Sequence, residues 1–246
     1  IWLSPIYPSP DVDFGYDVAD YTAIDPKFGS MADFDRLVVE ARQRNIHIIL
    51  DLVLNHTSDQ HAWFIQSQKS KDNPLHDWYM WHDPKPNGQP PNNWQAIFGG
   101  SAWEYDPHLD QYYYHMFYKE QPDLNWRNPE VRQAMLNVFR FWLDKGVDGF
   151  RLDVFNMYFK DEALRDNPTK IGLRGFDRQK HIYDNSQPEM FPILQEIREI
   201  LDQYPHSYAV GETFLADPKQ TAAYCGEDKL HAAFNFDFAE NRWHPK

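Results

Sequence analysis

Cysteine is nearly absent from this 246-residue sequence, whose single example is Cys225. One thiol excludes an internal disulfide and a cysteine-rich zinc site. No run approaches the roughly 20 consecutive apolar residues of a membrane-spanning helix, so we expect no membrane partner. Basic residues are also few, with 24 Lys and Arg against 37 Asp and Glu and a formal net charge of -13. Because such a chain repels phosphate backbones, we expect no nucleic-acid partner either.

The rest of the composition is typical of a globular protein. Hydrophobic residues make up 42% of the chain and aromatic residues 16%, which argues against disorder. The length allows one large domain or two small ones. The sequence opens inside an apolar segment, Ile1-Trp2-Leu3, without a methionine before it. We therefore expect the chain to be part of a longer protein.

Strands and helices alternate in the predicted secondary structure. Short apolar segments predict five strands, at residues 1–3, 46–53, 149–154, 207–211 and 231–236. Apolar spacing and end signals predict helices at residues 31–44, 128–145, 188–204 and 218–225. This alternation favours an α/β fold in which crossover helices join the strands of a parallel sheet.

One segment interrupts the alternation. Residues 57–121 are rich in Pro and Asn and contain five of the nine tryptophans. We interpret this segment as an inserted, loop-rich subdomain with a short sheet of its own. Without it, about 180 residues remain, which suffice for five or six βα units of a barrel that typically uses about 250 residues for eight. A barrel built from this chain would therefore be incomplete.

Polar side chains cluster where three of the predicted strands end. Asp51 and His56 follow one strand, Arg151 and Asp153 end another, and Glu212 ends a third. Two carboxylates at neighbouring strand ends suit glycoside hydrolysis, in which one protonates the leaving oxygen and the other attacks or assists. Arg151 shares a strand face with Asp153 and would favour its ionised form. A purely structural ion pair would give the same pattern, and His56 could be a structural hydrogen-bond donor.

Six segments in order along the chain carry a more specific resemblance. They are residues 13–17 (DFGYD), 51–56 (DLVLNH), 98–103 (FGGSAW), 121–125 (QPDLN), 149–156 (GFRLDVFN) and 211–213 (GET). Together they resemble the α-amylase family of glycoside hydrolases, family 13, in its oligo-1,6-glucosidase and α-glucosidase branch. The resemblance implies a (β/α)8 TIM barrel with a subdomain after its third strand. Residues 1–56 would then carry strands 2–3, residues 57–121 subdomain B, and residues 122–246 strands 4–6.

The resemblance also assigns roles to particular residues. Asp153 would be the nucleophile of a retaining mechanism and Glu212 the acid and then the base, with their carboxyl carbons roughly 5–5.5 Å apart. The terminal glucose would be bound by Asp13, Tyr16, His56 and Arg151 and walled by Phe98 and Phe117. A valine after the nucleophile, here Val154, accompanies α-1,6 links in this branch. The implied activity is exo-acting release of glucose from isomaltose, maltose or similar α-glucosides.

The sequence also departs from the family pattern. The fourth signature, a His-Asp pair that supplies the third carboxylate, should come after residue 243, and the sequence ends without it. The first and last barrel strands and the C-terminal β domain are missing as well, so we expect low activity from this chain alone. The metal-binding loop that the branch often carries is also missing. We therefore predict neither a bound metal ion nor a cofactor.

Two alternative functions stay open from the sequence. An α-glucosyl transferase or isomerase, such as a trehalose synthase or sucrose isomerase, would use the same carboxylates and differ in how it excludes water. A non-catalytic binding subunit with the same barrel would have lost them, whereas both Asp153 and Glu212 are present here. Enzymes of this branch are commonly intracellular, which makes a cytoplasmic location our default expectation.

Overall fold

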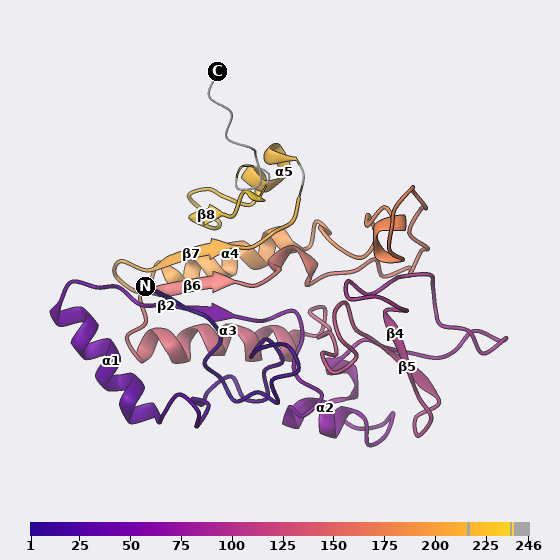
Figure 1. Cartoon of the computed structure of the whole chain (residues 1–246), viewed down its shortest axis with the longest axis horizontal. Helices are drawn as coiled ribbons and strands as arrows, with labels where there is room; N and C mark the ends of the chain where they lie inside the picture. The colour runs from indigo at the N-terminus through magenta and orange to yellow at the C-terminus, as the bar shows by residue number, and fades with distance from the viewer. Residues whose placement is uncertain (216, 237, 239–246) are drawn as a thin grey trace.

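The computed structural model describes residues 1–215, 217–236 and 238, and its main element is a parallel sheet (Figure 1). The strands are β1 (Trp2–Leu3), β2 (Ile49–Leu52), β6 (Gly149–Leu152), β7 (Tyr208–Gly211) and β8 (Ala232–Ala233). They lie side by side in chain order, and each neighbouring pair is parallel. This order and direction are those of a (β/α)8 barrel, of which the described strands form an open arc. All five predicted strands are present, and each is shorter than predicted.

The predicted helices are present between these strands. They are α1 (Met31–Gln43), α3 (Pro129–Asp144), α4 (Met190–Leu201) and α5 (Pro218–Ala223). The first begins with a capping box, in which the Ser30 hydroxyl accepts from the Asp33 N–H and the Asp33 carboxylate accepts from the Ser30 N–H. In α3 the side chain of Asn128 caps the first turn and a proline occupies the position after it. Both caps act within the first turn, and each helix starts within one residue of its predicted position.

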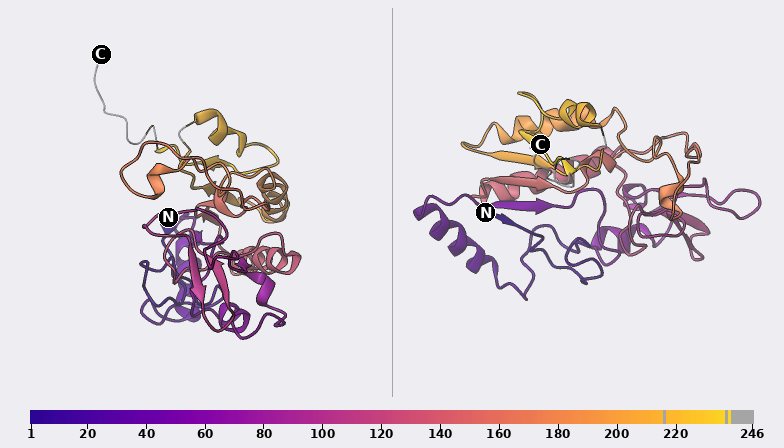
Figure 2. Two further views of the ribbon diagram at one scale, coloured as in Figure 1. Left: turned by 90° about the vertical axis from the view of Figure 1, so that its right-hand side faces the viewer. Right: turned by 45° about the horizontal axis from the view of Figure 1, so that its top comes forward.

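A second, antiparallel sheet lies within the inserted segment. Its strands are β3 (Trp81–His82), β4 (Trp103–Asp106) and β5 (Gln111–Tyr114), in the order β3-β5-β4. The short helices α2 (Ala62–Ser67) and η1 (His76–Trp78) precede it. The arrows of the parallel sheet point toward this second sheet, which therefore lies at their carboxyl ends (Figures 1 and 2).

Each sheet has its own apolar core. The larger cluster joins the parallel strands to their helices and includes the fully buried Leu50, Phe150 and Leu194. The smaller cluster belongs mainly to the inserted segment and consists of Trp94, Ala96, Ala102, Trp103, Tyr114, Met116, Val154 and Met157. Its last two members come from the chain just after β6. The end of a barrel strand is thus packed into the core of the inserted subdomain.

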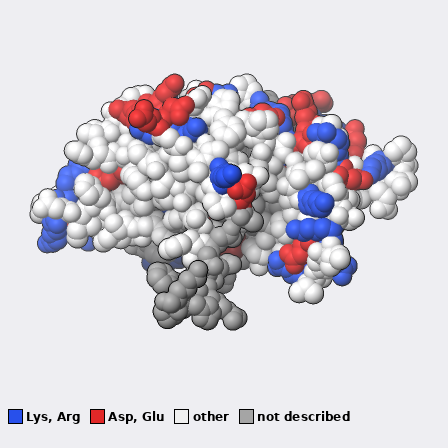
Figure 3. Space-filling model, turned by 90° about the horizontal axis from the view of Figure 1, so that it is seen from above, with Lys and Arg blue, Asp and Glu red and all other residues white. Residues whose placement is uncertain are grey.

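A long segment without regular strands follows β6 and contains the short helices η2 (Phe155–Met157) and η3 (Phe176–Arg178). It is attached to the inserted segment by a reciprocal pair of hydrogen bonds. Asn93 Nδ2 donates to the Asn167 carbonyl at 3.0 Å, and the Asn167 N–H donates to Asn93 Oδ1 at 2.9 Å. On the face shown in Figure 3, charged side chains lie mostly toward the edges. Within the described part of the chain, no helix has the length and apolarity to cross a bilayer.

Candidate active site

Three neighbouring strands bring the predicted polar residues together. Asp51 on β2 is paired in register with Arg151 on β6, so their side chains share one face of the sheet. The ladder continues past the strand ends, where the Asp153 N–H donates to the Leu52 carbonyl at 2.9 Å. In the same way, the Glu212 N–H donates to the Leu152 carbonyl at 2.8 Å. Both candidate catalytic carboxylates are therefore fixed at the backbone by the neighbouring strand.

The guanidinium of Arg151 lies at the centre of the site. Its Nη1 contacts Asp51 Oδ1 at 2.8 Å and Asp153 Oδ1 at 2.5 Å, and its Nη2 contacts Glu212 Oε2 at 2.6 Å. The four side chains are between 0% and 12% exposed. A planar guanidinium suits this arrangement because its donors point in fixed directions to several oxygens at once. One buried cation thus binds three carboxylates.

Aromatic rings cover the same guanidinium. Its carbon lies 5.4 Å from the ring centre of Trp2, 5.7 Å from that of Tyr16 and 6.0 Å from that of Phe234. Trp2 lies in the first strand of the arc and Phe234 directly follows the last, and their ring centres are 6.3 Å apart. The arc is therefore curved enough for its two ends to meet over Arg151. The rings exclude water from one side of the carboxylate cluster.

Burial and like charge dominate the ionisation of this cluster. Burial raises the pKa of Asp153 well above its usual value, and the charges of Asp51 and Glu212 raise it further, whereas Arg151 opposes the change. Burial likewise raises the pKa of Asp51 to about 6, again against the effect of Arg151. We expected Arg151 to favour the ionised form of Asp153. It does so, but two neighbouring carboxylates and desolvation outweigh it.

Hydrogen bonds link the other predicted polar residues to this cluster. The Tyr16 hydroxyl donates to Asp51 Oδ2 at 3.0 Å, and the Tyr16 carbonyl faces His56 Nε2 at 3.2 Å. Gln121 Nε2 donates to Asp13 Oδ2 at 3.0 Å and lies 3.1 Å from His56 Nε2. Burial lowers the pKa of His56 to about 4, so this imidazole is neutral at physiological pH. Asn55 Nδ2 lies 3.2 Å from Nδ1, an arrangement that suits a proton on Nε2.

The predicted aromatic wall extends from His56 toward the surface. The Phe117 ring centre is 5.0 Å from that of His56 and 5.8 Å from that of Phe98, whose side chain is 49% exposed. Val154 is placed differently from the other predicted residues. Although it follows Asp153 directly, it is only 3% exposed and belongs to the apolar cluster of the inserted segment. The structure therefore gathers the other predicted residues around one centre and directs the valine side chain into a core.

The structure adds a buried polar group that the sequence analysis did not identify. Lys160 and Asp123 form an ion pair in which both side chains are 0% exposed. Lys160 Nζ also donates to Asn55 Oδ1 at 3.0 Å, and Asn55 Nδ2 donates to Asp123 Oδ2 at 2.8 Å. This group lies directly behind His56. Asp123 belongs to a motif that the sequence analysis noticed, but nothing in the sequence around Lys160 marks it as a buried partner.

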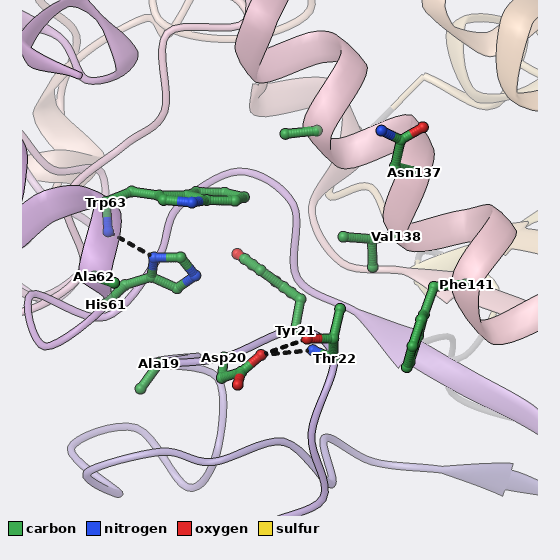
Figure 4. Close-up of a pocket in the computed structure, with 11 residues that line it drawn as sticks. Ala19, Asp20, Tyr21, Thr22, His61, Ala62, Trp63, Asn137, Val138 and Phe141 are labelled. Carbon is green, nitrogen blue, oxygen red and sulfur yellow. Dashed lines mark hydrogen bonds between the residues drawn. The ribbon is translucent and has the colours of Figure 1, made fainter. Parts of the chain in front are cut away.

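The described residues offer no metal site, and two of the predicted site residues, Phe98 and Phe117, line a cavity of about 350 Å³. In residues 1–215, 217–236 and 238, no group of three or more His, Cys, Asp or Glu side chains is arranged to hold a metal ion. A cavity of about 470 Å³ lies between residues 19–22, the start of α2 and one face of α3 (Figure 4). His61 lines it and caps α2 by accepting from the Trp63 N–H at 3.1 Å. None of the predicted site residues lines this cavity.

Comparison with known proteins gives a consistent result. A family model described as "Alpha amylase, catalytic domain" matches residues 1–246. A probable alpha-glucosidase from Rhizobium meliloti is 47% identical, and the match covers 97% of this chain and 46% of the relative. An oligo-1,6-glucosidase from Heyndrickxia coagulans is 48% identical over 96% of this chain and 42% of its own length. The chain thus spans less than half the length of these relatives.

Solved structures of similar proteins share the fold. The alpha-glucosyl transfer enzyme XgtA is 48% identical and superimposes with a TM-score of 0.92, over 96% of this chain and 46% of that one. The trehalose-6-phosphate hydrolase of Bacillus licheniformis is 40% identical with a TM-score of 0.90, over 97% of this chain and 42% of that one. At these identities the likeness extends beyond the fold to the sequence.

Proposed function

The chain belongs to the α-amylase family of glycoside hydrolases, and from that premise we propose that the protein containing it is a retaining, exo-acting α-glucosidase. The observation that carries the proposal is the pair of carboxylates, Asp153 and Glu212, held at two neighbouring strand ends by one guanidinium. Within this proposal, residues 1–56 and 122–246 are parts of the barrel and residues 57–121 are its subdomain B.

The proposed reaction has two displacement steps. Asp153 attacks the anomeric carbon of the terminal glucose while Glu212 protonates the departing glycosidic oxygen, which leaves a covalent glucosyl-enzyme. Glu212 then removes a proton from water, and the water displaces Asp153. The raised pKa of Asp153 supports a resting site in which the two carboxylates share a proton. The reaction needs that proton on Glu212 and the negative charge on Asp153.

The residues around the pair favour a terminal sugar. Neutral His56 and half-buried Asp13 offer polar contacts to the sugar, and Phe117 with Phe98 an aromatic wall on one side. By family resemblance, Val154 points to α-1,6 links, and several similar proteins are named oligo-1,6-glucosidases. We therefore propose isomaltose-like substrates before maltose-like ones.

A second function has specific support. The solved structures similar to this chain include an alpha-glucosyl transfer enzyme, a trehalulose synthase and an isomaltulose synthase. The first name describes transfer of a glucosyl group, and the other two describe synthesis of a sugar rather than its hydrolysis. Such a transferase or isomerase would use the same glucosyl-enzyme, so only the products distinguish it from a hydrolase.

The test is a product analysis. Protein carrying this chain is incubated separately with isomaltose, maltose and sucrose, and the Asp153→Asn variant serves as the blank. Glucose release that is faster from isomaltose than from maltose and absent from the variant is the expected result. Formation of a new disaccharide would instead support transfer. Equal glucose release by the wild type and the variant would refute the role of Asp153.

A further inference from the structure

The cavity shown in Figure 4 lies outside the proposed active site and is lined by both apolar and polar side chains. Its volume of about 470 Å³ is in the range of small-molecule binding sites. The half-buried rings of Trp63 and Phe141 and the methyl groups of Val138 supply most of its apolar lining. Tyr21 also lines it, and its hydroxyl lies 2.7 Å from the carbonyl oxygen of His56. The cavity is thus separate from the predicted sugar site but connected to it by the Tyr21 side chain.

A buried histidine directs a hydrogen-bond donor into this cavity. His61 is 5% exposed, and its Nδ1 accepts from the Trp63 N–H at 3.1 Å. Burial lowers the pKa of His61 to about 4, so the imidazole is neutral at physiological pH and its one proton is on Nε2. In the part of the chain that the structure describes, Nε2 has no hydrogen-bond partner, and Figure 4 shows it on the cavity side of the ring. A buried N–H group of this kind costs free energy until a ligand accepts from it.

Two further polar side chains complete the lining. Asp20 Oδ1 accepts from the N–H and the hydroxyl of Thr22, both at 2.8 Å, which leaves Oδ2 without a hydrogen bond from the described residues. Asn137 Oδ1 accepts from Gln133 Nε2 at 2.9 Å and from Arg140 Nη1 at 3.3 Å, so its Nδ2 can donate to a ligand. Of the described residues that line the cavity, none is Lys or Arg.

This set of groups decides which class of ligand fits. An anion would meet the Asp20 carboxylate with no cation beside it. A cation would suit Asp20 and the aromatic rings, but it would face the N–H of His61. A purely apolar molecule would leave that N–H buried and unpaired. A neutral molecule with several hydroxyl groups fits best, because each hydroxyl can both donate and accept while its C–H groups pack on the rings.

We propose that this cavity is a second saccharide site, which binds one glucose unit of an α-glucoside without cleaving it. Cleavage is not expected there because neither Asp153 nor Glu212 lines the cavity. In the bound state His61 Nε2 donates to one sugar hydroxyl and Asp20 accepts from another. The choice of glucose rests on the proposed α-glucosidase function, whereas the choice of a neutral ligand with several hydroxyl groups rests on the cavity alone.

The test is fluorine NMR on the full protein that contains this chain, labelled with 5-fluorotryptophan. The signals of Trp63 and Trp2 are assigned by their loss in Trp63→Phe and Trp2→Phe. Trp63 reports on the cavity, and Trp2, whose ring centre is 5.4 Å from the guanidinium carbon of Arg151, reports on the proposed active site. Glucose is the probe because a glucosidase does not hydrolyse it. Glucose should shift the Trp63 signal saturably, and the cation choline should not.

Substitutions on two walls of the cavity separate binding there from effects relayed from elsewhere. Ala134→Phe fills the cavity from α3 and should abolish the Trp63 response, whereas the matched control Ala134→Ser leaves the space open and should keep it. His61→Asn keeps a capping side chain at the start of α2 but removes the Nε2 donor. It should weaken glucose binding at the cavity by about 3- to 10-fold. The Trp2 signal and its response should be the same in all three variants as in the wild type.

Three results would overturn the inference: a Trp63 signal that glucose does not move, one that choline moves instead, or one that glucose still moves in Ala134→Phe. If Ala134→Phe does not fold, an unchanged affinity in His61→Asn overturns it as well. Failure of the proposed function would give a different pattern. In that case the protein would not cleave isomaltose and Trp2 would not respond to glucose, while the Trp63 comparison would still decide the cavity.

Discussion

Replacing Lys160 with methionine tests the buried polar group behind His56. Methionine has a similar length, so the substitution removes the charge with little change in packing. The change leaves the Asp123 carboxylate 0% exposed and without its cation. Two donors to that carboxylate would stay, the Met116 N–H at 2.8 Å and Asn55 Nδ2 at 2.8 Å. They offset only part of the loss, since neither carries a positive charge.

The expected magnitude follows from this geometry. Removing one partner of a buried ion pair typically costs about 3–5 kcal/mol, and the two remaining donors place Lys160→Met toward the lower end. Adding Asp123→Asn removes the stranded charge. Asn55 can then turn its amide so that its oxygen, released from Lys160, accepts from the new amide at position 123. The double variant should therefore recover at least half of the lost free energy of unfolding.

Urea unfolding measures the effect through the shift in midpoint at constant slope. The matched control is Lys145→Met, which breaks a surface pair between Lys145 and Asp35 at 3.1 Å, with side chains 30% and 48% exposed. That loss should be about 0–1 kcal/mol. Equal losses for the two single variants, or a double variant as unstable as Lys160→Met alone, would refute the assignment of Lys160 as a buried counter-charge.

Three further predictions concern the strands of the parallel sheet. Asp51→Asn removes a charge that raises the pKa of Asp153, so the acid limb of kcat/KM on an aryl α-glucoside should move to lower pH; an unmoved limb would contradict this. The pKa of Asp51 is about 6 in the folded chain, against an ordinary value of 3.8. Asp51 therefore stabilises the fold below about pH 4, and this contribution is lost as the pH rises through 6. The free energy of unfolding of Asp51→Asn should consequently depend less on pH than that of the wild type across this window. A Cβ on Gly211 would lie 2.4 Å from the Phe155 ring. Gly211→Ala should therefore lower the free energy of unfolding in urea by about 1–3 kcal/mol, and it should lower kcat by displacing the adjacent Glu212. An unchanged urea midpoint would show that the ring can move aside.

Local signals explain which parts of the fold could be predicted from the sequence. The spacing of apolar residues predicted α1, and the proline after Asn128 predicted the start of α3, because both signals act within a few helical turns. Glu212 and Asp153 could be paired because carboxyl ends of parallel strands meet at one edge of a sheet. The strand predicted at residues 231–236 is only Ala232–Ala233, because a strand with one neighbour receives fewer ladder bonds to extend it.

The missed features depend on contacts between distant segments. Lys160 is 37 residues from Asp123 and 105 from Asn55, and no local pattern relates them. The left-handed conformation of Val154 could not be expected either, since valine disfavours it and only the core of the inserted subdomain makes it stable. Both features join the chain after β6 to segments that are distant in the sequence, and such coupling is invisible to periodicity.

The charge balance of the site connects its packing to its chemistry. Three buried carboxylates around one guanidinium leave an excess of negative charge in a region that Trp2, Tyr16 and Phe234 shield from water. Binding one proton relieves that excess, which is why burial and like charge raise the pKa of Asp153. A retaining mechanism also starts with one proton for its two catalytic carboxylates. Under the proposed mechanism, the raised pKa of Asp153 therefore means that the resting site already binds the one proton that the first step needs.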